Sequence, residues 1–208
     1  MIDTNVLVHW LMATNIMESV AGEFDLGEEL VRVYRKRYEP SCSFVDKVLQ
    51  SRGSGREFVV TELSLNETFS GIRDEVRSVI LFVKGVPISR WASKRETKEV
   101  SFPESLSKKI YESTLRAFDS LYGQHRIVII PVTKPSDEEN YFDIYSSLIF
   151  LNPHLMTQDA ILLTTAIFEQ VDCFVTADKG LTTLGRQLFT KYHVEVLPPE
   201  KAIRYLVE

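Results

Sequence analysis

Short apolar runs, rich in β-branched residues, recur along the chain. Such runs are typical of strands that are covered on both faces. Runs of this kind occupy 126–132, 172–176 and 194–197, and a shorter one at 57–60 follows a glycine-rich turn. We therefore expect a strand at each of these four places.

Between these runs, apolar residues recur at three- and four-residue spacing, which predicts helices. The first should begin at Asn5, whose side chain is suited to cap a helix. Further helices are expected at 27–37, 43–51, 61–72, 104–122, 136–150, 158–170 and from Pro199 onward. Pro40 should separate the second helix from the third, because proline lacks the N–H that a helix interior needs. The basic segment 84–103 contains two prolines and should form an exposed loop.

Strands that alternate with helices predict the fold class. The pattern favours an α/β protein, a three-layer α/β/α arrangement around a mostly parallel central sheet. A chain of 208 residues suits a single domain, 1–208, with a largely helical insertion at 84–125. In such sheets the functional side chains gather at the carboxyl ends of the strands. Acidic residues at those ends are therefore of interest.

Composition is that of a folded protein, with 44% apolar and 25% charged residues. The two cysteines, Cys42 and Cys173, are too few for a disulfide framework and lack the spacing of a zinc site. A reducing cytosol fits them best, so we expect a cytoplasmic protein. The sequence shows neither a secretory segment nor an apolar run of about 18 residues, so we expect no membrane span.

Charge is distributed unevenly along the chain. The net charge of −5 argues against a globally basic nucleic-acid binder. Arginine and lysine are nevertheless concentrated at 32–38, 51–56 and 89–98. These segments suit either solvated surfaces or contacts with an anionic partner.

Four acidic residues stand where an α/β fold would bring them to one end of the sheet. Asp3 precedes the first helix, Glu67 lies in the second turn of the helix after 57–60, Asp159 begins another helix, and Asp178 follows the strand at 172–176. At a separation of about 4 Å and an effective dielectric constant of about 20, two carboxylates repel by roughly 4 kcal/mol. A cluster must therefore take up protons or a cation. Oxygen ligands without a His or Cys cluster favour Mg²⁺ or Mn²⁺.

Each acid also has a purely structural interpretation. Asp159 could serve the dipole of its helix, and Asp178 could begin a turn before Gly180. Glu67 could close a capping box with Ser64, and Asp3 could be an exposed residue near the terminus. The two interpretations differ in whether the four side chains come together.

Four stretches of the sequence resemble one known family in combination. They are "IDTNVLVHWL", "VVTELSLNET", "TQDAILLTTAIFEQVDCFVTADKGL" and "VEVLPPEKAI". Together they look like the PIN domain, in particular the VapC-type ribonuclease toxins. The most specific part is an Asp-Ala pair that opens an apolar helix, with Asp178 following Asp159 by 19 residues.

The resemblance implies hydrolysis of RNA, in single-stranded or exposed regions, by a Mg²⁺- or Mn²⁺-dependent endoribonuclease. The catalytic and metal-binding residues it implies are Asp3, Glu67, Asp159 and Asp178. Thr176, implied to hold the attacking water or to act as an outer-shell ligand, and Asn5 match accompanying polar positions. A toxin of this type would have an antitoxin protein as partner, and relatives commonly form homodimers.

The chain also departs from that family. It is longer than the toxins, and only Met1 and Ile2 precede Asp3 where the family has a full strand. Either the natural start lies upstream or the central strand is shortened. A PIN-fold RNA-binding or assembly module without catalysis is therefore the main alternative. A phosphatase of the haloacid dehalogenase type is a second, although its opening motif has Asp where this chain has Asn5.

Other polar and aromatic residues give weaker signals. The four histidines, His9, His125, His154 and His193, share no ligand spacing, so surface or core positions are expected for them. Trp91, in the basic segment, could stack on an unpaired base or pack inside the insertion.

Overall fold

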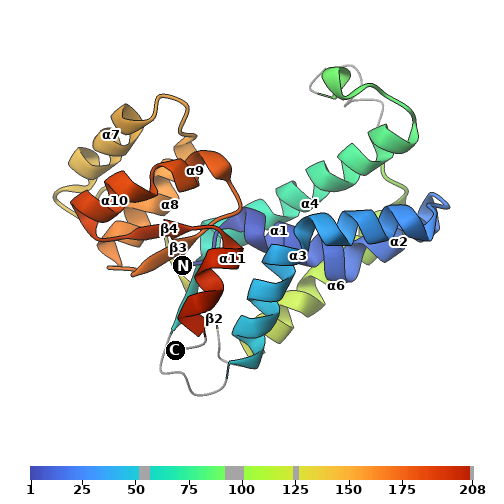
Figure 1. Cartoon of the computed structure of the whole chain (residues 1–208), viewed down its shortest axis with the longest axis horizontal. Helices are drawn as coiled ribbons and strands as arrows, with labels where there is room; N and C mark the ends of the chain where they lie inside the picture. The colour runs from blue at the N-terminus through green and yellow to red at the C-terminus, as the bar shows by residue number, and fades with distance from the viewer. Residues whose placement is uncertain (52–56, 92–100, 124–126, 207–208) are drawn as a thin grey trace.

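Helices make up most of the chain in the computed structural model, which describes residues 1–51, 57–91, 101–123 and 127–206 (Figure 1). Strands are short and pair in parallel. They are β1 (Phe58–Thr61), β2 (Ile127–Ile130), β3 (Cys173–Val175) and β4 (Glu195–Leu197). β1 pairs with β2 and β3 pairs with β4, in two separate two-stranded sheets. The predicted three-layer α/β/α fold around a central, mostly parallel sheet is therefore wrong.

The main reason is that helices take up most of the described residues, while each strand is only three or four residues long. The first part contains α1 (Thr4–Leu11), the π-helical η1 (Met12–Ile16), α2 (Met17–Glu23), α3 (Glu28–Gln50), α4 (Glu62–Val83), η2 (Ile88–Arg90) and α6 (Glu104–Gly123). The second part contains α7 (Tyr141–Leu151), α8 (Thr157–Phe168), α9 (Lys179–Thr183), α10 (Gly185–Tyr192), α11 (Pro199–Ala202) and η3 (Ile203–Leu206). In Figure 1, α7, α8, α9 and α10 lie on one side of β3 and β4, and α1, α3, α4 and α6 extend on the other.

The first three residues connect the two sheets through the main chain. The N–H of Ile2 donates to the carbonyl of Val59 in β1, at 2.8 Å. On the other side, the N–H of Val175 in β3 donates to Met1, and the N–H of Asp3 donates to Val175, both at 2.9 Å. These bonds fix the backbone of Asp3 at the carboxyl end of β3, where α1 begins.

One long helix, α3, replaces the two helices predicted on either side of Pro40. Proline removes one helical hydrogen bond, but the helix continues because packing outweighs that loss. Phe44, Val45 and Val48 lie on its buried face, in the core formed with α1. Tertiary burial of this kind regularly overrides local propensity.

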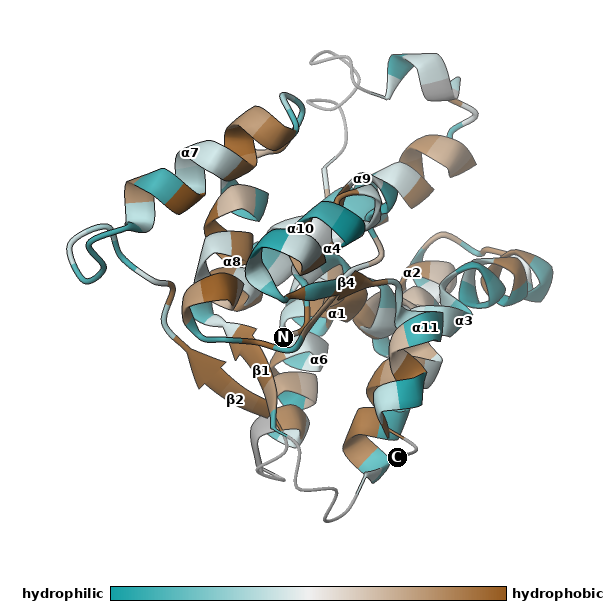
Figure 2. Ribbon diagram, turned by 60° about the vertical axis from the view of Figure 1, so that its left-hand side comes forward, coloured by the Kyte–Doolittle hydropathy of each residue, from teal (hydrophilic) through white to brown (hydrophobic). Residues whose placement is uncertain are grey.

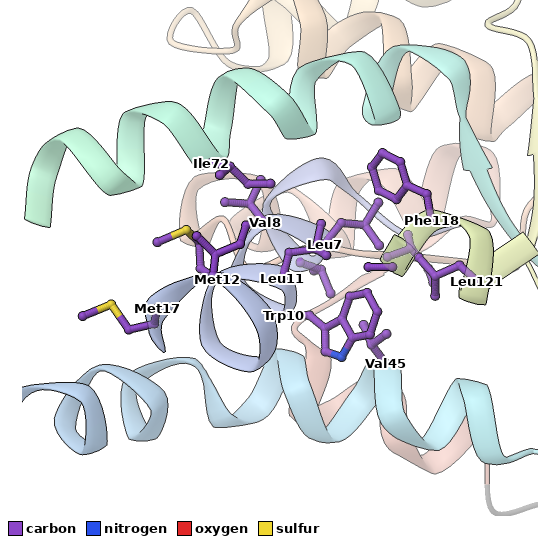
Figure 3. Close-up of a cluster of buried hydrophobic side chains, with 14 of the residues drawn as sticks. Leu7, Val8, Trp10, Leu11, Met12, Met17, Val45, Ile72, Phe118 and Leu121 are labelled. Carbon is purple, nitrogen blue, oxygen red and sulfur yellow. The ribbon is translucent and has the colours of Figure 1, made fainter. Parts of the chain in front are cut away.

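The first core is centred on α1, which packs between α3 and α4 (Figure 3). Leu7, Leu11 and Met12 are fully buried there. α1 and α4 approach closely because Gly71 has no side chain: a Cβ at that position would lie 2.6 Å from Cγ2 of Val8. α4 runs on to Val83, past the predicted end at 72.

β3 supplies side chains to two cores. Val175 belongs to the first core, whereas Phe174 lies in a second one with Leu148, Leu163 and Leu188 from α7, α8 and α10. The prediction that this strand is covered on both faces is confirmed by the burial of Phe174 and Val175.

β2 differs from the prediction of a strand covered on both faces. Its Val128 and Ile129 are 38% and 40% exposed, and the apolar ribbon lies at an edge in Figure 2. A continuous apolar run does not distinguish a central strand from an apolar edge strand.

The segment predicted as an insertion, 84–125, is only partly covered, because 92–100 and 124–125 lie outside the described residues. Its helix α6 contributes Leu106 and Leu121 to the first core. The described helices include none with the length and apolar character needed to span a membrane.

Candidate acidic site

Four segments bring carboxylates into electrostatic range of one another. Asp3 caps α1, Glu67 lies on α4, Asp159 is in the first turn of α8, and Asp178 caps α9. Asp159 and Glu67 both raise the pKa of Asp3, and Asp178 and Glu67 both raise the pKa of Asp159. The structure therefore links the four predicted acids through pairwise electrostatic interactions, in which Asp178 acts on Asp159.

Asp3 is the most buried of them, with 3% of its surface exposed. Its Oδ1 accepts from the N–H of Thr4 at 2.7 Å, and its Oδ2 accepts from the hydroxyl of Thr176 at 2.6 Å. Burial, followed by the charges of Asp159 and Glu67, raises the pKa of Asp3 from 3.8 to about 7, although the two hydrogen bonds oppose the shift. Asp3, rather than Asn5, is the cap of α1, so the prediction for the Asn5 cap is wrong.

Glu67 points its carboxylate toward α1. Its Oε2 accepts from the hydroxyl of Thr4 at 2.9 Å. The capping box proposed for Glu67 with Ser64 does not form, because Thr61 is the cap of α4 and accepts from the N–H of Ser64 at 3.0 Å. Glu67 is thus available to the acidic cluster.

Asp159 and Asp178 complete the cluster from the other core. Burial, then the charges of Asp178 and Glu67, raises the pKa of Asp159 to about 6. Oδ1 of Asp178 accepts from the N–H groups of Gly180 and Leu181, at 2.5 and 3.3 Å, and so begins α9. Asp178 therefore begins a turn, as predicted, and also belongs to the acidic cluster.

Thr176 and Asn5 form a hydrogen-bonded network next to Asp3. The Asn5 Oδ1 accepts from the N–H of Ala177 at 2.9 Å, which directs its Nδ2 to the hydroxyl of Thr176 at 3.3 Å. That hydroxyl also accepts from the N–H of Asp178 at 3.0 Å while donating to Asp3. A hydroxyl has one proton and two lone pairs, so Thr176 is fully used. This geometry suits a residue that orients Asp3 better than one that holds a water.

The donor chemistry fits a hard divalent cation. All four side chains offer oxygen, and none of the ion pairs among the described residues involves them. Even so, within 1–51, 57–91, 101–123 and 127–206, no three His, Cys, Asp or Glu side chains are arranged closely enough to hold a metal ion. Asp3, Glu67 and Asp178 each accept hydrogen bonds from neighbouring groups.

His9 and Trp91 make contacts that do not involve the acids, and His154 and His193 are exposed. His9 stacks on Tyr38, with ring centroids 4.1 Å apart, and burial lowers its pKa to about 4. The indole N–H of Trp91 donates to the carbonyl of Val86 at 2.8 Å, and the ring packs on the first core. His125 lies outside the described residues.

The basic segment 32–38 is engaged on the surface of α3. Arg32 pairs with Glu29 at 2.6 Å, and Arg35 pairs with Glu18 at 2.6 Å. These contacts favour the solvated-surface interpretation for this segment. Most of the segments 51–56 and 89–98 falls outside the described residues.

Thr4 is a site residue that the sequence reasoning missed. Its backbone N–H binds Asp3 and its hydroxyl binds Glu67. A hydroxyl next to the acid that caps α1 was the only available signal, and it does not fix the direction in which the hydroxyl points.

No protein-family model, curated protein or solved structure matches this chain.

Proposed function

We propose that the protein is a Mg²⁺- or Mn²⁺-dependent endoribonuclease that hydrolyses RNA phosphodiester bonds at the acidic site. One observation carries the proposal: four carboxylates from distant parts of the chain lie in mutual electrostatic range, with no cationic side chain paired to them among the described residues. A fold gains nothing in stability from such an arrangement. A bound cation would offset the repulsion between the carboxylates.

The residues divide into direct ligands and supports. Asp3, Glu67, Asp159 and Asp178 would supply oxygen ligands once their side chains turn toward the ion, because the described residues do not hold three of them around one point, and Thr176 would orient Asp3 through its hydroxyl. When bound, such an ion supplies a water of lowered pKa and a positive charge for a phosphate oxygen. Asp3 and Asp159, with pKa values raised to about 7 and about 6, would release their protons as the ion enters.

RNA is proposed as the substrate because of the resemblance to PIN-domain ribonucleases. Lys179, exposed beside Asp178, would supply a positive charge for a phosphate near the acids. An antitoxin that covers the site, a homodimer and a cytoplasmic location belong to the same proposal. The two free cysteines suit a reducing compartment.

The test combines metal binding with cleavage of labelled single-stranded RNA. We expect the parent protein to bind Mn²⁺ in calorimetry and to cut RNA only when Mn²⁺ or Mg²⁺ is added. Asp178→Asn and Asp159→Asn should each lower the rate of cleavage at least about 100-fold, since each removes a ligand charge. Asn is as good a helix cap as Asp, so α9 should survive in Asp178→Asn. Asp119→Asn, on the exposed face of α6, is the matched control and should cut like the parent.

The same assays separate the alternatives. Mn²⁺ and RNA binding without cleavage by the parent would favour a binding module. Release of phosphate from small monoesters with RNA untouched would favour a phosphatase. If the parent binds neither Mn²⁺ nor Mg²⁺ at millimolar concentration, the metal-dependent mechanism is wrong.

A further inference from the structure

We propose that the cavity at the amino end of β3 binds a small organic cation with an apolar body, such as an aromatic amine. The cavity has a volume of about 600 Å³, which falls in the range of about 300 to 1,000 Å³ that small-molecule sites usually have. Asp178 follows the opposite, carboxyl end of β3, so the cavity is separate from the acidic site. Binding here needs neither the metal ion nor the RNA of the proposed function.

The walls of the cavity come from several parts of the chain. Residues 57–59, at the start of β1, line it together with residues 171–173, at the start of β3. α10 contributes Phe189 and His193, and η3 contributes Tyr205. β1 and β3 are packed into the two cores, which holds their walls in place.

Aromatic rings supply much of the apolar wall. Phe44 is 2% exposed and Phe58 is partly buried, so the first core holds both rings in position beside the cavity. Phe189 is 50% exposed, and its ring is therefore accessible to a ligand. The face of an aromatic ring attracts a cation as well as an apolar group. The cavity can therefore remove an apolar body from water and favour a positive charge attached to it.

Acidic side chains line the same cavity and select the charge of the ligand. They are Glu57, Glu169, Asp172 and Glu195. Among the lining residues that the structure describes, none is a lysine or an arginine. Glu195 is already paired with Arg204 at 2.8 Å, whereas Glu169 and Asp172 are exposed and take part in none of the ion pairs among the described residues. A cavity lined by one sign of charge concentrates ions of the opposite sign.

Met1 also lines the cavity, and its amino group is the positive group that a ligand would meet there. This amino group donates to the carbonyl of Cys173 at 2.7 Å. Burial lowers its pKa to about 6, although the charge of Asp172 acts in the opposite direction. At pH 7.5 the amino group is therefore mostly uncharged, and it repels a cationic ligand little.

Three ligands of similar shape and different charge test the proposal. They are 2-phenylethylamine, which is a cation at pH 7.5, the neutral 2-phenylethanol, and the anion 3-phenylpropionate. Each is titrated into the full chain in EDTA, and nuclear magnetic resonance of the labelled protein measures the affinity. We expect saturable binding of the amine, at least about tenfold tighter than binding of the alcohol. The anion should bind more weakly than the alcohol.

Variants of exposed lining residues locate the binding site. Asp172→Asn combined with Glu169→Gln should weaken binding of the amine by about three- to tenfold and leave the affinity for the alcohol unchanged. Phe189→Ala should weaken binding of both ligands, because it removes an aromatic wall. Phe150→Ala is the matched control, because Phe150 is 87% exposed and is not among the lining residues. Binding of the amine should also survive Asp178→Asn in the acidic site.

Three results would overturn the proposal. The first is no saturable binding of the amine by the parent protein, and the second is equal affinity for the amine and the alcohol. The third is loss of amine binding in Asp178→Asn with parent-like binding in the Asp172 and Glu169 double variant, which would place the amine in the acidic site. None of these results bears on cleavage of RNA, because the titrations contain neither metal nor RNA. Far-ultraviolet circular dichroism of each variant checks that the fold is intact.

Discussion

Asp3→Asn should remove one component of the pH dependence of stability in the metal-free protein, while the opposite contributions of His9 and the Met1 amino group, whose pKa values burial lowers, persist in both proteins. Asp3 is 3% exposed, and burial raises its pKa to about 7. Because the folded-state pKa lies above the unfolded value of 3.8, the folded protein retains the proton over this interval. The contribution of Asp3 to stability is therefore complete below about pH 4 and is lost as the pH rises through about 7.

The magnitude follows from the shift. Each unit of pKa difference corresponds to about 1.4 kcal/mol, so a shift of about three units gives roughly 4 kcal/mol over the whole interval. Between pH 5 and pH 8 the expected loss from Asp3 is roughly 2 to 3 kcal/mol. Asp159, with its pKa raised to about 6, adds a smaller loss in the same direction, which persists in the variant.

The substituted residue can be accommodated in the site. The amide oxygen of Asn can accept from the N–H of Thr4 as Asp3 does, while its NH₂ faces Thr176. The Thr176 hydroxyl can then turn its proton to Oδ1 of Asn5, which lies 3.5 Å away. The cap of α1 is thereby retained, because Asn and Asp cap helices equally well.

Urea unfolding between pH 5 and pH 8 in the presence of EDTA measures the effect. The free energy of unfolding of the parent should fall relative to that of Asp3→Asn by roughly 2 to 3 kcal/mol between pH 5 and pH 8. Asp119→Asn should follow the parent. Parallel curves for the parent and Asp3→Asn would show that Asp3 does not titrate with a raised pKa. If the variant is less stable than the parent by the same amount at every pH, Asp3 contributes to stability only through its hydrogen bonds.

Two further predictions concern the packing around α1, and urea unfolding at pH 7 checks both. Gly71→Ala should destabilise the fold by about 1 to 3 kcal/mol, because the new methyl group would meet the buried, branched Val8, whereas Gly22→Ala, with nothing within 4 Å, should change stability by about 1 kcal/mol or less. Leu7→Ala should cost about 2 to 5 kcal/mol because Leu7 is fully buried, and Leu115→Ala, 38% exposed, should cost much less. Equal effects within either pair would contradict the packing described.

Local patterns in the sequence predicted most helices. They failed where tertiary packing determines whether a helix continues or how strands pair. α8 and α6 lie close to their expected ranges because their apolar residues recur at helical spacing. The break expected at Pro40 is absent, since the buried face of α3 extends on both sides of the proline. The sheet was mispredicted because three- and four-residue strands carry too little pattern to fix how they pair.

For the candidate site, the sequence predicted acids that interact electrostatically, but the described residues include no three carboxylates arranged to hold an ion. Asp3, Glu67, Asp159 and Asp178 come into range of one another because each stands at the start of a helix or in its first two turns. Their hydrogen-bond partners could not be foreseen from spacing alone. The contact between Thr4 and Glu67 joins residues 63 positions apart and depends on how α1 crosses α4.

The two cores meet the acidic site from opposite directions. Asp3 and Glu67 are carried by α1 and α4, whose apolar faces enter the first core, whereas Asp159 is carried by α8 in the second. An ion shared among them, as the proposed function requires, would therefore cross-link the two cores. Amide hydrogen exchange in α8 and α1 should slow together when the ion binds. The same site would then control both the chemistry and the local opening of the two cores.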